Sequence, residues 1–101
     1  MKKNIAILAS GNGSNTENIC RFFLGSPDVN VVLIGTNNKN AFVINRAKKL
    51  KVPFFVFSKT ALDNFDEIEK FFIKKNVDFV VLAGFLLTIK LPVLTLWILL
   101  Y

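Results

Sequence analysis

The residues best suited to chemistry are glycines and small polar side chains near the amino terminus, Ser10–Asn15. Gly11 and Gly13 would let the backbone turn tightly and approach a ligand closely. Ser14 is a good helix N-cap, and Glu17 three residues later completes the S-x-x-E pattern of a capping box. A helix that begins here would direct its amides and its positive dipole end at a phosphate ester. We expect five residues to hold that phosphate: Gly11, Asn12, Gly13, Ser14 and Asn15.

The same run has a purely structural alternative, in which the glycines only make a tight turn and Ser14 only caps the helix. Two other nucleotide-binding patterns are excluded. A dinucleotide site needs a third glycine where this sequence has Thr16, and an acid after the second strand, where Gly35–Asn40 carries none. A Walker loop is absent because no Gly-Lys-Ser or Gly-Lys-Thr follows the glycines.

Composition narrows the possible chemistry further. The chain has 101 residues, no histidine and one cysteine, so it can build no histidine triad, histidine–metal site or disulfide framework. A hydrophobic content of 52% and a charged content of 20% exclude a disordered tail. The net charge of +6 comes from scattered lysines and arginines, which indicates a solvated surface rather than a nucleic-acid site. The single thiol, with no leader pattern, predicts a cytoplasmic protein.

The elements that must position the loop follow from hydrophobic spacing. Four nearly continuous apolar runs are typical of strands buried on both faces of a parallel sheet: Ile5–Leu8, Val29–Ile34, Phe54–Phe57 and Val77–Leu82. Three segments with helical spacing lie between them: Asn15–Leu24, Ala41–Leu50 and Asp63–Lys75. Because crossovers are right-handed, the order βαβαβαβ predicts the α/β class with a Rossmann-like doubly wound parallel sheet. Five side chains at apolar positions are predicted to pack in the core: Cys20, Phe42, Phe65, Phe72 and Phe79.

The last stretch of the chain has a different composition. Between residues 77 and 101 only Asp78 and Lys90 are charged, and Leu91–Tyr101 shows no cap, turn signal or polar face. We interpret it as an aberrant apolar C-terminal tail. An alternative is a tail-anchored membrane protein that spans the bilayer with Phe79–Tyr101, since about 20 apolar residues suffice. A lysine near the middle would cost roughly 2.5–3.5 kcal/mol on insertion, and the sheet needs the start of this stretch as a strand, so a membrane location is not favoured.

Four segments together resemble phosphoribosylglycinamide formyltransferase, a folate-dependent enzyme family of purine synthesis. Ala9–Asn15 is similar to the family's opening phosphate loop, and the residues from Val77 to Phe85 are similar to its fourth strand and the start of its folate pocket. Two weaker matches lie between them, over residues 38–47 and at Val52-Pro53. The resemblance covers about residues 3–89. It divides the chain into a formyltransferase N-terminal, phosphate-substrate-binding half, 1–89, and an unmatched apolar tail, 90–101.

The resemblance implies transfer of a formyl group from 10-formyltetrahydrofolate to glycinamide ribonucleotide in de novo purine (IMP) biosynthesis. The predicted phosphate loop would hold the phosphate of glycinamide ribonucleotide. The pterin of the formyl donor would lie in a folate pocket lined by Gly84, Phe85, Leu86 and Leu87. The reaction uses no metal.

The sequence also departs from the family pattern. The family moves its proton with a histidine in an Asn-x-His-Pro segment and a later aspartate, but this chain has no histidine. We therefore assign no catalytic residue and expect a truncated or frame-shifted copy that is inactive alone. Such a copy would expose a sheet edge, which favours self-association. An alternative is a non-catalytic module that binds a phosphorylated metabolite through Gly11–Asn15.

Overall fold

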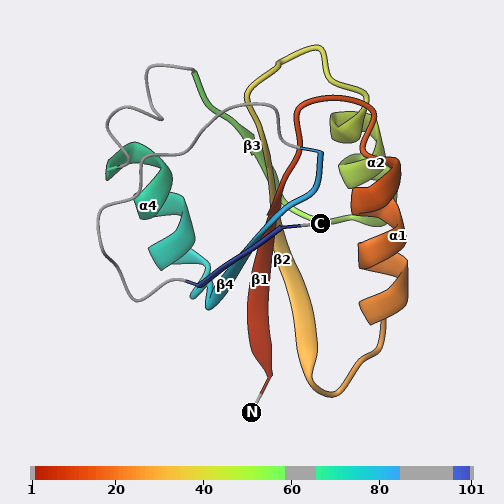
Figure 1. The fold of residues 1–101 in the computed structure, drawn as a ribbon, viewed down its shortest axis with the longest axis vertical. Helices are drawn as coiled ribbons and strands as arrows, with labels where there is room; N and C mark the ends of the chain where they lie inside the picture. Colours follow the sequence, from red (N-terminus) through yellow and green to blue (C-terminus); the bar gives the residue numbers. More distant parts are fainter. Residues whose placement is uncertain (1, 59–65, 85–96, 101) are drawn as a thin grey trace.

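A computed structural model describes residues 2–58, 66–84 and 97–100 of the chain (Figure 1). Strands and helices alternate in the order that hydrophobic spacing predicts, and a fifth strand follows them. Their bounds are β1 Lys3–Leu8, α1 Ser14–Phe23, β2 Val29–Thr36, α2 Val43–Leu50, β3 Phe54–Val56, α4 Asp66–Lys74, β4 Phe79–Leu82 and β5 Trp97–Leu100. The predicted strands and helices are therefore confirmed where the structure describes them, with bounds that shift by one to three residues.

The strands form one parallel sheet with the order β3-β2-β1-β4-β5, which confirms the predicted doubly wound α/β fold. The chain adds β2 and then β3 on one side of β1, and returns to place β4 on the other side. The strand order therefore reverses between β1 and β4, which makes this place a topological switch point. Ligands of doubly wound sheets bind in the crevice at this point, outside the carboxyl ends of the strands.

The middle of the sheet is buried on both faces, whereas Phe54 and Val56 of the edge strand β3 are exposed. Figure 1 shows α1 and α2 on one side of it and α4 on the other. Successive side chains of β1 point to opposite faces, so Ala6 and Leu8 pack with Phe72 of α4, while Ile5 and Ile7 pack with Ile19 of α1. This two-sided burial explains why the strand segments are almost continuously apolar rather than alternating.

Of the predicted core aromatics that the structure describes, one is buried, one is half-buried and one is exposed. Phe72 is buried as expected, with 1% of its surface exposed, but Phe42 is 51% exposed, so its predicted burial is wrong. Phe42 is the N-cap of α2, where its ring lies 5.0 Å below the guanidinium of Arg46. The arginine thus covers the ring in place of the core. Phe79 is half-buried, and Phe65 lies outside the described residues.

The end of the chain contributes a strand. Trp97–Leu100 pairs in parallel with β4 as an edge strand, opposite the other edge strand, β3. The membrane-spanning alternative is not favoured, because both ends of the proposed span, β4 and β5, are strands of the sheet. Over the described ranges, no helix is long and apolar enough to cross a bilayer. Residues 90–96 and 101 of the predicted tail lie outside the described residues.

Candidate functional site

The predicted capping box does not form at the start of α1. The N-cap is Gly13 in the left-handed region (φ 81°, ψ 19°), no side chain caps the helix, and Ser14 is its first helical residue. Glu17 is therefore the fourth helical residue, whereas the glutamate of a capping box is the third. The Glu17 carboxylate instead pairs with three cations, Arg46 at 2.8 Å, Arg21 at 2.9 Å and Lys49 at 3.3 Å.

The loop between β1 and α1 directs its carbonyl groups toward the protein. Gly11 O accepts from the amide of Val43 at 3.1 Å, and Asn12 O accepts from Nε of Arg46 at 2.8 Å, both on α2. Gly13 O accepts from the amide of Glu17 at 2.9 Å and so begins the ladder of α1. In a trans peptide the carbonyl and the following N–H point in opposite directions. The amides that follow these three carbonyls, from Asn12 to Ser14, therefore point away from their partners.

These amides are available to a ligand. The N–H groups of Asn12, Gly13, Ser14 and Asn15 donate to no acceptor among the described residues. The side chains of Asn12, Ser14 and Asn15 are exposed rather than packed inward. The helix dipole adds the equivalent of about half a positive charge at this end of α1. The loop thus combines free donors with a positive potential, the arrangement that binds phosphate groups in other proteins.

An open pocket of about 230 Å³ is lined by the loop and by the end of β4, through Gly11, Asn12, Gly13, Ser14, Asn15, Ala83 and Gly84. It lies at the switch point between β1 and β4. The structure therefore brings all five predicted phosphate-binding residues together, and Gly84 of the predicted folate group beside them. The other three folate-pocket residues, Phe85, Leu86 and Leu87, lie outside the described residues.

Gly13 also provides close contact between the loop and α2. A Cβ atom added at Gly13 would overlap the side chain of Val43, lying 2.6 Å from its Cβ and 3.0 Å from its Cα. The positive φ of 81° is a second reason why glycine suits this position. Because Gly13 has no side chain, the loop can lie directly against the first turn of α2, where hydrogen bonds also hold it.

Arg46 also belongs to the site, although no sequence motif predicted a role for it. Its Nη2 donates to Asn12 Oδ1 and its Nη1 donates to Glu17 Oε1 at 2.8 Å, in addition to the Nε bond to Asn12 O. The hydrogen bonds from Arg46 and then from Arg21 and Lys49 lower the pKa of the Glu17 carboxyl from 4.5 to about 2. Asn12 and Arg46 are 34 residues apart, so no local sequence pattern could have paired them.

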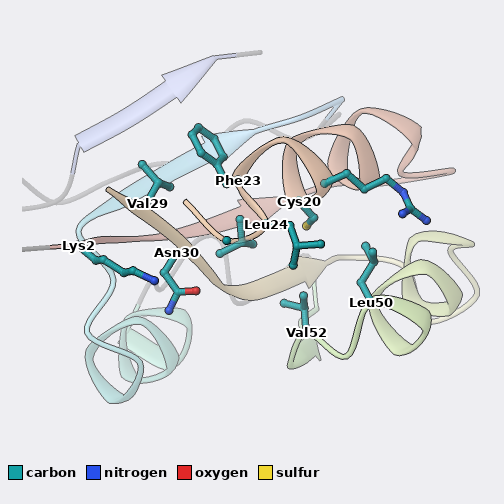
Figure 2. A pocket seen from close by; sticks show the side chains of 11 residues that line it. Lys2, Cys20, Phe23, Leu24, Val29, Asn30, Leu50 and Val52 are labelled. Carbon is teal, nitrogen blue, oxygen red and sulfur yellow. The ribbon is translucent and has the colours of Figure 1, made fainter. Parts of the chain in front are cut away.

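A second pocket, of about 110 Å³, lies at the opposite end of the strands (Figure 2). Its lining includes Cys20 and Leu24 at the end of α1, Val29 at the start of β2, Leu50 at the end of α2, and Val52 between α2 and β3. Burial raises the pKa of the Cys20 thiol to about 11, and the side chain is free of any disulfide. The prediction of a buried structural thiol is confirmed.

The fold and the loop together define a class: a doubly wound α/β domain with a glycine-rich loop at its switch point. A family model described as "Formyl transferase" matches residues 3–99, so the chain belongs to the formyl transferase family.

Individual relatives align with most of this chain. The chain is 33% identical over 89 residues to the phosphoribosylglycinamide formyltransferase of Bacillus subtilis, an alignment that covers 83% of this chain and 46% of the relative. It is 36% identical over 93 residues to the chloroplastic phosphoribosylglycinamide formyltransferase of Arabidopsis thaliana, covering 84% and 31% of the two chains. Its structure matches that of the Campylobacter jejuni phosphoribosylglycinamide formyltransferase with a TM-score of 0.79 and 33% identity, covering 89% and 52%. The chain therefore spans less than half the length of the Bacillus subtilis and Arabidopsis thaliana relatives.

Proposed function

We propose that this chain supplies the phosphate-binding half of a phosphoribosylglycinamide formyltransferase. In this role the loop Gly11–Asn15 binds the phosphate of glycinamide ribonucleotide. The observation that carries the proposal is the set of donor groups without partners among the described residues, on Asn12 to Asn15, at the start of α1. Membership of the formyl transferase family supports it independently, as do relatives named for this activity.

The proposed reaction forms a bond between the glycinamide amine and the formyl carbon of 10-formyltetrahydrofolate. The bond from that carbon to the donor nitrogen breaks, and the amine loses a proton that the donor nitrogen gains. Charge develops on the formyl oxygen, which requires hydrogen-bond donors, and the proton requires a carrier. The described residues contribute binding: fixing the phosphate at one end of the substrate limits where its amine can lie. Because the chain contains no histidine, an imidazole of its own cannot carry the proton.

The formyl donor belongs to the same proposal. Gly84 lies two residues after the end of β4 and lines the pocket together with the loop, and Phe85, Leu86 and Leu87 follow it in the chain. A folate bound there would be adjacent to a substrate held by the loop. No metal takes part in this scheme, and the proposed place of action is the cytoplasm.

The test is an NMR titration of the ¹⁵N-labelled chain with glycinamide ribonucleotide. We expect the amide resonances of Asn12, Gly13, Ser14 and Asn15 to shift on binding, because an amide that donates to a phosphate oxygen is deshielded. The matched control ligand is glycinamide riboside, which lacks only the phosphate and should leave these resonances unchanged. Equal shifts with both ligands, or shifts confined to residues outside the loop, would refute the proposed site.

A further inference from the structure

Arg46 donates hydrogen bonds to three acceptor atoms, and no other described side chain contacts all three. Its guanidinium donates to the carbonyl oxygen of Asn12, to the side-chain Oδ1 of the same residue, and to the carboxylate of Glu17. The Arg46 side chain is 20% exposed and that of Glu17 is 12% exposed, so their bond is partly buried, whereas the two bonds to Asn12 lie at the exposed surface of the loop. Among the described cations, Lys49 and Arg21 also reach Glu17, but only Arg46 reaches Asn12.

The two bonds to Asn12 fix the orientation of a peptide plane. That plane carries the Asn12 carbonyl on one side and the Gly13 amide on the other. Because Arg46 holds the carbonyl toward α2, the Gly13 N–H must point away from α2. The bond from Val43 to Gly11 O has the same effect on the preceding plane, so α2 orients two consecutive loop amides.

We propose that Arg46 is a positioning residue for the phosphate loop, which orients the Asn12–Gly13 peptide before any ligand binds. The inference rests on the proposed function of the loop and goes beyond it by naming the group that prepares the loop for an anion. Preorganisation of this kind strengthens binding because the loop loses little further conformational freedom when the ligand arrives. A guanidinium suits the task because its planar fork offers several donors at fixed angles, whereas an ammonium is a point charge on a flexible stem.

The electrostatics at neutral pH fit this role. The pKa of Glu17 is about 2, so the carboxylate stays charged and holds the third donor group of the guanidinium. The bond to Glu17 leaves the other two donors facing Asn12. Glu17 therefore fixes the arginine, and the arginine fixes the loop.

The experiment measures the dissociation constant of ribose 5-phosphate by calorimetry for the wild type and three variants. We expect Arg46→Met to weaken binding about tenfold and Arg46→Lys to weaken it by an intermediate factor, since lysine keeps the charge but not the fork. The control Lys49→Met removes an equal charge from the same helix, and a contact with Glu17, without touching Asn12. It should change the dissociation constant by less than twofold.

Two outcomes would overturn the inference. Equal losses in Arg46→Met and Lys49→Met would mean that only general charge matters, and wild-type affinity in Arg46→Lys would mean that the fork is not needed. A second readout needs no ligand: the ¹⁵N resonances of Asn12 and Gly13 should move in the free Arg46→Lys protein, and unchanged resonances would also overturn the inference. If the wild type fails to bind ribose 5-phosphate while these resonances move as expected, the proposed function fails and the positioning role stands.

Discussion

Replacing Gly13 with alanine tests the packing of the loop against α2. The alanine would occupy φ 81°, a left-handed conformation that costs an L-residue roughly 1–2 kcal/mol. Its Cβ would also overlap Val43, which is fully buried at the start of α2, and overpacking of this kind costs about 1–3 kcal/mol. We therefore expect Gly13→Ala to lower the free energy of unfolding by about 2–5 kcal/mol.

Gly25 offers a matched control. It has a similar conformation, φ 75°, but a Cβ added there would meet no atom within 4 Å. Gly25→Ala should therefore carry only the conformational cost of about 1–2 kcal/mol. The difference between the two variants isolates the overlap with Val43.

Urea denaturation followed by circular dichroism measures both variants. With a slope of roughly 1–3 kcal/mol per molar urea, the difference between them moves the midpoint by about 1 M. In the double variant Gly13→Ala/Val43→Ala the two losses should be less than additive, because the Cγ2 atom that the new methyl group overlaps is gone, although the overlap with Cβ remains. Equal losses in Gly13→Ala and Gly25→Ala, together with additive effects in the double variant, would refute the reasoning.

Three further predictions concern the core, the thiol and the ion-pair cluster. Phe72→Ala removes a buried ring and should cost about 3–5 kcal/mol, whereas Phe22→Ala, at a ring 80% exposed, should stay within about 0.5 kcal/mol in the same urea assay. Because the pKa of Cys20 rises to about 11, its thiolate fraction at pH 8 is reduced, and labelling by a disulfide reagent should be about 100-fold slower in the native than in the urea-unfolded protein; equal rates would contradict its burial. The pKa of Glu17 falls from 4.5 to about 2 on folding, so the stability it contributes is present above pH 4.5 and is lost as the pH falls toward 2. Thermal melting across this range should show a flatter profile for Glu17→Gln, and parallel profiles would rule out the ion pairs with Arg46, Arg21 and Lys49.

The fold could be predicted from the sequence because its determinants are local and repeated. Runs such as Ile5–Leu8 and Phe79–Leu82 are apolar on both faces, which is typical of a covered parallel sheet. The position of the loop follows from the same order of elements. The exposure of Phe42 could not be predicted, because periodicity does not distinguish a helix's first turn, where an arginine can cover the ring, from its buried middle.

The start of α1 shows why local patterns mislead at the site itself. The S-x-x-E pattern at Ser14 favours a capping box, but a capping box is stabilised only by two hydrogen bonds within one turn. Glu17 gains three cationic partners from pairing across to α2 and along α1, and the left-handed Gly13 provides the N-cap conformation without a side chain. Long-range charge pairing therefore replaces the local cap.

A glycine-rich loop is usually treated as a ligand site defined by its own few residues. Here the glycines permit the conformation, but they do not select it, because glycine has access to many others. Selection comes from α2, where the Val43 amide and the Arg46 guanidinium hold two successive loop carbonyls. The loop amides that have no partner among the described residues are thus a consequence of carbonyl groups that are bound elsewhere. The proposed anion site would accordingly depend on the contact between two helices, and its affinity should depend on residues of α2 that never contact the ligand.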